Sequence, residues 1–450
     1  MFLLFDLDGV LVEFKQIHKQ AFLEAWNELN PSFPISEEFH AKHLEARSTK
    51  QKLAICATFH KSDTNAVYEK KQAITELYLR NANVYTNTKR ALQWAVDHGH
   101  TLVCCSNSIR STVETSLSKL IPLESFAFYL SNEDVTAPKP DPEMYVKAVE
   151  KLNANPKDVL IFEDSEVGKQ AAYAAGFTVI PIVDALDLTP RFLEQSIQHR
   201  ARPMCPRINV VIPMAGLGSR FQKCGYTTPK PFLPVFGKPM FQWVIENIVP
   251  KSIQPFAKIH LIVREEHRAR FDEYNTEDSY HIHTVPTLTE GAACTVLSIR
   301  ESIDNEDPLV IANSDQYLDW DAEGFYNCLF HPDWDGVLST FPQHDPTDLR
   351  WSYVQMSKEG EVERVEEKMF LGPLATTGVY GWKRGKDFVQ DTLQMIQANI
   401  RVNNEFYVCP VYNMGIERSL KFRTLDCEKM WGLGVPTDYE HFLTNWNTKC

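Results

Sequence analysis

The sequence lacks the features that would place a protein in a membrane, send it out of the cell or bring it to nucleic acid. No stretch approaches the roughly 18 apolar residues that a membrane span requires. The N-terminal segment MFLLFDLDGV has no basic region and reaches Asp6 and Asp8 too early for a signal peptide. The 59 acidic side chains outnumber the 46 basic ones, and the net charge of -13 argues against a broad basic surface for nucleic acid. We therefore expect neither a membrane nor a nucleic-acid partner.

The ten cysteines lack the paired spacing of a metal site. Cys104 and Cys105 are adjacent in an apolar run typical of a buried strand, where the geometry of a disulfide is hard to meet. Reduced thiols in a cytoplasmic protein fit this pattern better. The sequence has no short-period repeat and no low-complexity tract, and it leaves the oligomeric state open.

The sequence does contain two successive α/β patterns. Four β-rich runs, each followed by a helix-like segment, predict a parallel sheet with crossover helices; they are FLLFDLD, TLVCCSNS, DVLIFEDS and FTVIPIV. A helical stretch between the first two runs predicts an inserted cap at about residues 14–84. A polar, proline-containing segment then precedes INVVIPMAG, where a second α/β pattern begins. We therefore expect domains at 1–200 and 208–450, joined by a linker at 201–207.

Two carboxylates end the first predicted strand. Asp6 and Asp8 are two residues apart, so they share one side of the strand tip, at the sheet edge where ligands bind in parallel sheets. One carboxylate can attack phosphorus to form an aspartyl-phosphate, while its neighbour protonates the leaving oxygen and later deprotonates water. Carboxylates this close favour a Mg²⁺ cofactor. The alternative is a simple turn closed by Gly9.

Three later segments support the catalytic interpretation. Ser106 and Asn107 end the second run, where a hydroxyl and an amide N–H can hold phosphoryl oxygens. Lys139 lies between prolines and is suited to neutralise a phosphate and a nucleophilic aspartate. Glu163 and Asp164, at the tip of a further strand, add acidic metal ligands. Each residue alone could be a helix cap or a surface charge, but the ordered set predicts a phosphate site.

This ordered set, DLDGV, SNS, KPDPEMY and FEDSEVGKQAAYAAG, resembles the haloacid dehalogenase superfamily, in the branch that contains β-phosphoglucomutase and sugar phosphatases. The resemblance covers about residues 1–190 and implies a Rossmann-like core with a helical cap. It implies Asp6 as the nucleophile and Asp8 as the acid/base. The remaining implied roles are Mg²⁺ binding by Asp6, the Asp8 carbonyl and Asp164, and stabilisation of the phosphoryl group by Ser106 and Lys139.

The cap decides between hydrolysis and mutase chemistry. The mutase pattern has a Lys-Gly pair before a Ser-Arg pair, whereas this chain reads LEARSTK. Thr49 stands where an arginine would grip a distal phosphate, although Arg47 or Lys50 could substitute. We therefore favour a phosphatase. The alternative is a sugar phosphomutase that supplies a sugar 1-phosphate to the second domain.

A loop with two glycines follows the first strand of the second pattern, in the segment MAGLGSRF. Gly216 and Gly218 allow backbone amides to cradle a triphosphate, and Arg220 can pair with its outer phosphates. The third glycine of a dinucleotide-binding fingerprint is absent. Lys230 follows in the proline-rich segment TTPKPFLPVFGKPM, which restricts where the cation can point.

The loop and the PKPF segment resemble nucleotidyltransferases that make sugar nucleotides from sugar 1-phosphates, with relatives that activate phosphocholine. The resemblance covers about residues 208–445 and implies a Rossmann-like domain with a mixed sheet. A phosphorylated metabolite would attack the α-phosphorus of an NTP and release pyrophosphate, helped by Arg220, Lys230 and a Mg²⁺ on Asp315. The other implied site residues are Ala215, Gly216, Gly218, Ser219, Glu290 and Gly291 for the nucleotide, and Glu367, Lys368, Thr377 and Gly378 for the substrate phosphate or sugar.

Several details stay open at this point. Gly432 stands where many members carry a second metal-binding aspartate, for which Asp438 or Asp426 could substitute. An ionised Glu290 only accepts hydrogen bonds, which suits the cytosine amino group and favours CTP. The DWD motif at 319–321 would suit a glycosyltransferase, and an inert sensor of phosphorylated ligands is a further alternative. The fusion itself suggests two steps of one pathway, such as the synthesis of surface-glycan precursors.

Overall fold

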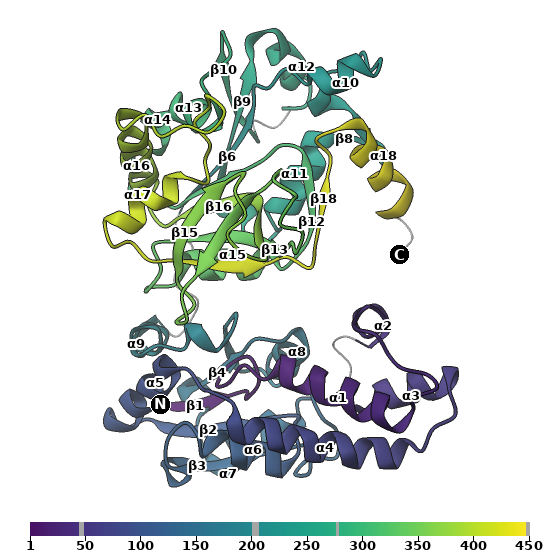
Figure 1. Ribbon diagram of the computed structural model, residues 1–450. Helices are drawn as coiled ribbons and strands as arrows, with labels where there is room; N and C mark the ends of the chain where they lie inside the picture. Colours follow the sequence, from purple (N-terminus) through teal and green to yellow (C-terminus); the bar gives the residue numbers. More distant parts are fainter. Residues whose placement is uncertain (45–48, 200–206, 276–278, 447–450) are drawn as a thin grey trace. The chain divides into compact units, whose positions relative to one another are not determined.

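The structure is a computed structural model that describes residues 1–44, 49–199, 207–275 and 279–446. The chain divides into two compact units, Met1–Pro203 and Met204–Cys450. Each unit has its own sheet (Figure 1), which confirms the expected α/β class, with a parallel sheet first and a mixed sheet second. Nearly all of the linker expected at 201–207 lies outside the described residues.

The first unit is built on a five-stranded parallel sheet in the order β3-β2-β1-β4-β5. β1 is the central strand, with β2 on one side and β4 on the other, so the winding of the chain reverses there. Such a switch point opens a crevice at the carboxyl ends of the strands, where ligands bind. The strands are β1 Phe2–Phe5, β2 Thr101–Cys105, β3 Phe126–Leu130, β4 Val159–Glu163 and β5 Thr178–Pro181.

Helices cover both faces of this sheet. Leu3 and Phe5 of β1 pack with α5, α6 and α9, while Leu4 packs with α7 and α8 on the opposite face. Because both faces are buried, β1 is apolar at every position. The helices are α5 Thr86–Asp97, α6 Arg110–Leu117, α7 Glu143–Leu152, α8 Glu166–Ala174 and α9 Pro190–His199.

Four helices between β1 and β2 form a separate cluster, which we call the cap. Their shared core contains Phe22, Trp26, Leu53 and Val67. The helical spacing of the apolar residues in the first of these helices is consistent with this inward face. The cap helices are α1 Lys15–Leu29, α2 Glu37–His43, α3 Thr49–Phe59 and α4 Thr64–Asn81.

The second unit is built on a nine-stranded mixed sheet with the main order β10-β9-β6-β11-β16-β13-β17; β14 pairs with β15 and β16. The first four strands of this order are parallel, while β16 runs antiparallel to both β11 and β13. The strands are β6 Ile208–Met214, β9 Ala257–Arg264, β10 His281–Val285, β11 Leu309–Ala312, β13 Gly336–Pro342, β14 Ser352–Met356, β15 Val362–Glu367, β16 Leu374–Trp382 and β17 Phe422–Asp426.

Two short ladders lie beside this sheet. β12 Gln316–Asp319 pairs with β18 Lys429–Gly432, and β7 Pro234–Val235 pairs with β8 Lys238–Pro239. The first of these ladders brings the region around Gly432 against the strand that follows Asp315. The helices of this unit are α10 Ser219–Lys223, α11 Met240–Ile248, α12 Arg268–Asp272, α13 Ala292–Leu297, α14 Arg300–Ile303, α15 Ala322–Phe330, α16 Gly385–Gln397, α17 Val411–Glu417 and α18 Pro436–Asn445.

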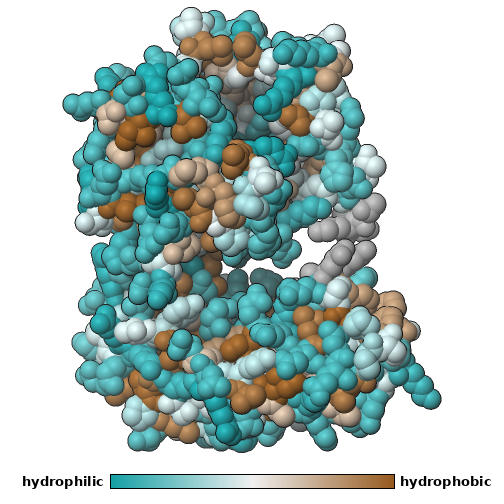
Figure 2. Space-filling view, viewed as in Figure 1, coloured by the Kyte–Doolittle hydropathy of each residue, from teal (hydrophilic) through white to brown (hydrophobic). Residues whose placement is uncertain are grey.

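Within the described ranges, no helix is both long enough and apolar enough to cross a bilayer. The face drawn in Figure 2 is mostly hydrophilic, with hydrophobic residues in small separate groups. The eight cysteines of the described ranges are free thiols.

Candidate active sites

A buried lysine joins two carboxylates at the carboxyl ends of β1 and β4. The Lys139 ammonium donates hydrogen bonds to Asp6 Oδ1 at 2.7 Å, to Glu163 Oε1 at 2.5 Å and to the Cys105 carbonyl at 2.8 Å. The Lys139 side chain is only 3% exposed, so these contacts are made away from water. Tyr145 adds a further hydrogen bond to Glu163. The structure thus places the predicted nucleophile and the predicted lysine in direct contact.

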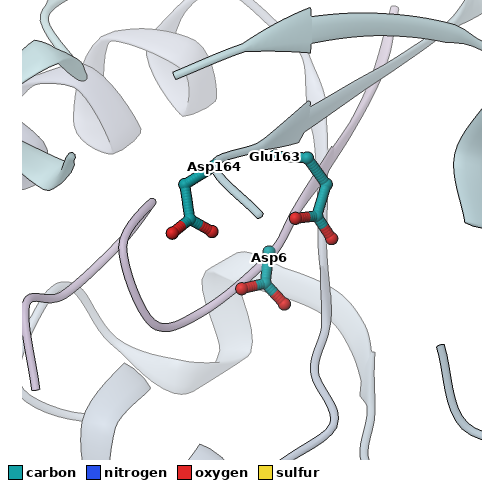
Figure 3. Close-up of side chains that lie close together, drawn as sticks. All are labelled: Asp6, Glu163 and Asp164. Atoms are coloured by element: carbon teal, nitrogen blue, oxygen red, sulfur yellow. The ribbon is translucent and has the colours of Figure 1, made fainter. Parts of the chain in front are cut away.

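Three carboxylates come together here as a candidate metal site. Oxygens of Asp6, Glu163 and Asp164 all lie within 4.8 Å of one another at the ends of β1 and β4 (Figure 3). Burial raises the pKa of Asp6, and the neighbouring Glu163 and Asp164 add to this effect, while Lys139 opposes it. A cluster of carboxylate oxygens is the donor set that Mg²⁺ prefers, and a divalent cation would offset their repulsion.

The Asp164 carboxylate packs so closely against Gly9 that no larger residue fits at position 9. Gly9 has a φ of +96°, and a Cβ at that position would lie 2.2 Å from Asp164 Oδ2. Asp164 Oδ1 is buried and has no hydrogen-bond partner among the described residues. An orphaned carboxylate oxygen beside two other carboxylates fits a metal ligand.

The Asp8 side chain is held separately from the cluster of three carboxylates. Its Oδ1 accepts a hydrogen bond from the Phe14 N–H at 2.7 Å, and its Oδ2 lies 3.8 Å from His18 Nε2. Burial raises the pKa of Asp8 to about 6, although the Phe14 N–H opposes this change. A carboxyl group with this pKa can both give and take a proton near neutral pH, as an acid/base must.

The two predicted phosphate-binding residues at the end of β2 differ in what they contact. Ser106 is buried, and its hydroxyl accepts a hydrogen bond from the Ser108 N–H at 3.1 Å. The Asn107 amide instead holds the backbone of Lys139, through two hydrogen bonds of 3.1 Å. Asn107 therefore anchors the loop that carries the buried lysine.

The cap contributes basic side chains next to Asp8. Lys71 is buried, and its ammonium lies 3.4 Å from His18 Nδ1. Burial lowers the pKa of Lys71 to about 8 and that of His18 to about 3, with nearby lysines adding to both effects. Thr49 begins α3, whereas Arg47 lies outside the described residues.

A cavity of about 400 Å³ at the end of β6 is the candidate site of the second unit. Gly218, with a φ of +62°, ends the loop after β6 and caps α10. Lys230 contacts the Asp315 carboxylate across this cavity. Of the predicted residues, the cavity is lined by Ala215, Gly216, Gly218, Lys230, Gly291 and Asp315.

Several predicted residues of the second site lie outside the cavity wall. Ser219 and Arg220 are exposed at the start of α10. The side chain of Glu290 is 63% exposed and pairs with Arg401 at 2.6 Å. Its neighbour Gly291 does line the cavity, and it must be glycine because φ is +124° and a Cβ would lie 2.5 Å from the Phe406 carbonyl.

The residues predicted to hold the acceptor lie in and after β15 and in β16, and they are not among the residues that line the cavity. Glu367 is buried and accepts a hydrogen bond from Ser352, whereas Lys368 donates to the Tyr407 hydroxyl at 2.6 Å. Thr377 is buried, with a hydroxyl that lacks a partner among the described residues.

Gly378 packs directly on the strand end that carries the predicted metal ligand of this unit. It has a φ of +89°, and a Cβ there would meet the Asn313 side chain at 2.1 Å. Asn313 in turn lines the cavity beside Asp315. The predicted substrate loop therefore reaches the cavity wall through Asn313.

Sequence reasoning expected Glu163 as an acidic metal ligand beside Asp164, but its contacts with Lys139 could not be read from spacing. It did not select two residues of the second unit, Glu405 and Tyr407. Glu405 lines the cavity and Tyr407 holds Lys368. Neither belongs to a recognisable motif, so only the fold brings them to the site.

Near the cavity, the structure places Asp438 rather than Asp426 beside Gly432. A Cβ at Gly432 would lie 3.2 Å from Asp438 Oδ2, and a Cβ at Gly434 would lie 3.0 Å from Asp315 Oδ2. Asp426 instead accepts a hydrogen bond from Thr340 at 2.7 Å.

Two α/β units, each with acidic and basic side chains gathered at strand ends, define a two-domain enzyme of phosphate chemistry. Comparison with known proteins makes this specific. Residues 3–182 match the family described as haloacid dehalogenase-like hydrolase, and residues 209–405 match the family described as nucleotidyl transferase. The chain is therefore a fusion of one domain that matches the haloacid dehalogenase-like hydrolases and one that matches the nucleotidyl transferases.

Curated relatives match the first unit. A phosphorylated carbohydrates phosphatase of Thermotoga maritima is 25% identical over 209 residues, which cover 44% of this chain and 93% of that protein. A haloacid dehalogenase-like hydrolase domain-containing protein of Arabidopsis thaliana is 29% identical over 210 residues, covering 40% of this chain and 66% of the relative. The match therefore spans slightly less than two thirds of the plant protein.

Solved structures resemble each unit. A nucleoside-diphosphate-sugar pyrophosphorylase from Vibrio cholerae is 24% identical, with a TM-score of 0.45; the match covers 52% of this chain and all of that one. CbbY from Rhodobacter sphaeroides is 23% identical, with a TM-score of 0.36; the match covers 40% of this chain and 85% of that one.

Proposed function

We propose that the first unit is a Mg²⁺-dependent phosphatase that works through an aspartyl-phosphate. We propose that the second unit transfers a nucleotidyl group from an NTP to a phosphorylated metabolite and releases pyrophosphate. The observation that carries the proposal is the buried contact of Lys139 with Asp6, next to the carboxylates of Glu163 and Asp164. The second reaction is supported by the cavity in which Lys230 faces Asp315.

In the first reaction, Asp6 Oδ attacks the phosphorus of the substrate, and the bond to the leaving oxygen breaks. Asp8 gives its proton to that oxygen, then takes a proton from the water that hydrolyses the aspartyl-phosphate and regenerates Asp6. Lys139 balances the charge of the nucleophile and of the phosphoryl oxygens. Asp6, Asp164 and the Asp8 carbonyl would hold Mg²⁺, which when bound neutralises the phosphate.

In the second reaction, a phosphate oxygen of the acceptor attacks the α-phosphorus, and the bond to the pyrophosphate oxygen breaks. No protein nucleophile is needed, so the residues act by position and charge. Amides of the loop that contains Gly216 and Gly218 hold phosphate oxygens, Lys230 contacts the α-phosphate, and Arg220 turns inward to the leaving group. Asp315, together with Asp438, would hold the Mg²⁺ of this site.

The acceptor that we propose is a sugar phosphate or a similar metabolite, used for surface-glycan precursors. Lys368 would hold its phosphate, and Glu367, Thr377 and Gly378 would contact the remainder. CTP is the nucleotide that we expect, because a glutamate accepts a hydrogen bond from the cytosine amino group. In the structure Glu290 pairs with Arg401, so reading cytosine requires that this pair opens.

Both aspartates of the Asp-x-Asp motif, on which the glycosyltransferase alternative depends, make hydrogen bonds within the fold. Asp321 caps α15 by accepting a hydrogen bond from the Gly324 N–H at 2.8 Å, and Asp319 accepts one from the Trp431 indole at 3.0 Å. These contacts favour a nucleotidyltransferase over a glycosyltransferase.

One observation supports the mutase alternative for the first unit. The buried Lys71 ammonium lies beside His18 and has no carboxylate within salt-bridge distance among the described residues, so it could hold a second phosphate. A mutase would return an isomerised phosphate ester, whereas a phosphatase releases inorganic phosphate.

The test uses the full chain with hexose and polyol phosphates, each of the four ribonucleoside triphosphates, dTTP and Mg²⁺. Phosphate and pyrophosphate are measured in the parent and in Asp6→Asn and Asp315→Asn variants. We expect Asp6→Asn to lose phosphate release and keep pyrophosphate release, and Asp315→Asn to do the reverse. Isomerised ester without phosphate would establish the mutase alternative. Equal signals in all three proteins would contradict both assignments and support an inert sensor.

A further inference from the structure

The two oxygens of Asp164 have different surroundings. Oδ1 is buried without a partner among the described residues, and one oxygen of this carboxylate lies within 4.8 Å of oxygens of Asp6 and Glu163. Oδ2 accepts a hydrogen bond of 2.8 Å from the Lys15 ammonium. The Asp164 side chain is 5% exposed, so water has little access to either of its carboxylate oxygens. One oxygen is therefore fixed by lysine, and the other is left for a ligand.

Lys15 reaches Asp164 from the cap. It is the first residue of α1, and Phe14 before it donates its N–H to the Asp8 carboxylate. The short segment that leads from β1 into the cap therefore fastens both the predicted acid/base and the predicted metal ligand. Asp164 lies at the end of β4, 149 positions away along the chain, so this contact exists only in the folded unit.

We infer that Lys15 is a positioning residue for the metal site: by holding Oδ2 of Asp164, it keeps Oδ1 turned toward the cation. The inference rests on the proposed function, because it needs Asp164 to be a metal ligand. Hydrogen bonds to ligating carboxylates orient them, and removing such partners weakens metal binding by about 10- to 100-fold. Lys15 itself touches neither the substrate nor the cation.

The positive charge of Lys15 has an opposing effect, which is smaller. An ammonium near a bound cation repels it, but the Lys15 side chain is 55% exposed and water screens this repulsion. The carboxylates of Asp6, Asp8, Glu163 and Asp164 also outnumber the lysines that contact them. We therefore expect the loss of orientation to dominate when Lys15 is replaced.

The experiment measures Mg²⁺ binding by calorimetry on the full chain, with Asp315→Asn in every protein so that the second unit does not contribute. Lys15→Met removes the hydrogen bond, and Lys15→Arg keeps the charge and the donors. Lys19→Met is the matched control, because Lys19 lies on the same helix and pairs with Glu37 at 3.0 Å instead of a site residue. Thermal unfolding in EDTA shows whether each variant is folded.

We expect Lys15→Met to raise the Kd for Mg²⁺ about 10- to 100-fold, and Lys15→Arg and Lys19→Met to stay within about threefold of the parent. The midpoint of unfolding in EDTA should be the same for Lys15→Met and Lys19→Met. A Lys15→Met protein that binds Mg²⁺ as tightly as the parent, or more tightly, overturns the inference. So does a Lys15→Arg protein that binds as poorly as Lys15→Met. If the parent itself binds no Mg²⁺, the proposed metal site fails first, and the two failures are thus distinguished.

Discussion

Replacing Lys139 by methionine should destabilise the first unit strongly, because it leaves two buried carboxylates without a counter-charge. The ammonium lies 2.7 Å from Asp6 and 2.5 Å from Glu163. At an effective dielectric constant of about 20, each such pair attracts by about 6 kcal/mol before the cost of desolvation. Measured losses for breaking a buried pair are about 3–5 kcal/mol, and we expect this range for the free energy of unfolding.

The cost should depend on pH in a definite direction. Burial already raises the pKa of Asp6, and removing Lys139 takes away the interaction that opposes this rise. Groups with a raised pKa in the folded state contribute stability below the unfolded pKa, and this contribution is lost as the pH rises through the folded pKa. The destabilisation by Lys139→Met should therefore be larger at pH 8 than at pH 5. Adding Glu163→Gln should recover part of it at pH 8.

The assay is hydrogen exchange in EDTA, read on peptides of β1 and β4, which reports the first unit separately from the second. Lys147→Met is the matched control: Lys147 pairs with Glu143 on the surface of α7, and its loss should cost less than about 1 kcal/mol. A Lys139→Met protein within about 1 kcal/mol of the parent at pH 8, or one that loses more stability in acid, would refute the reasoning.

Three further predictions concern the second unit. Tyr407→Phe removes the hydroxyl that holds Lys368, so we expect the KM for the phosphorylated acceptor to rise about 5- to 10-fold while the KM for the NTP stays constant in steady-state kinetics. Gly291→Ala should lower the free energy of unfolding by about 1–3 kcal/mol and weaken NTP binding in calorimetry, because of its φ of +124°. The matched control is Gly216→Ala: its added methyl group meets open space, so the urea midpoint of unfolding should stay unchanged. His260 is buried, and burial lowers its pKa to about 3. The free energy of unfolding of this unit should therefore fall by about 2 kcal/mol between pH 7 and pH 5 in urea titrations, because the unfolded state takes up the proton. His260→Gln should reduce this pH dependence.

The sequence predicted the parts of the sites that follow from strand ends. Parallel strands share one carboxyl edge, so locating Asp6 and Asp164 at the ends of apolar runs was enough to expect them close together. The same rule placed Lys230 and Asp315 in one site only with the help of the family resemblance, since the loop that carries Lys230 has no regular spacing. The α/β class of both units followed from the alternation of apolar runs and helical segments.

The remaining features depend on side chains that meet across long stretches of chain. Glu290 looked free to read a base, but Arg401, more than a hundred positions later, occupies its carboxylate. Asn107 was expected only to hold phosphoryl oxygens, and its side chain also holds the Lys139 backbone. Pairing of this kind is set by tertiary packing, which neither propensity nor motif spacing records.

The central place of β1 has a consequence for synthesis on the ribosome. β1 pairs with β2 and with β4, whose last residue is Glu163, so the sheet cannot assemble until that strand has left the exit tunnel. During this interval the edge of the apolar β1 strand that β4 will cover stays unpaired, which exposes it to non-native pairing. Mutations that slow the pairing of β1 with β4 would therefore lower the yield of folded protein in the cell, even where the finished enzyme is stable and fully active.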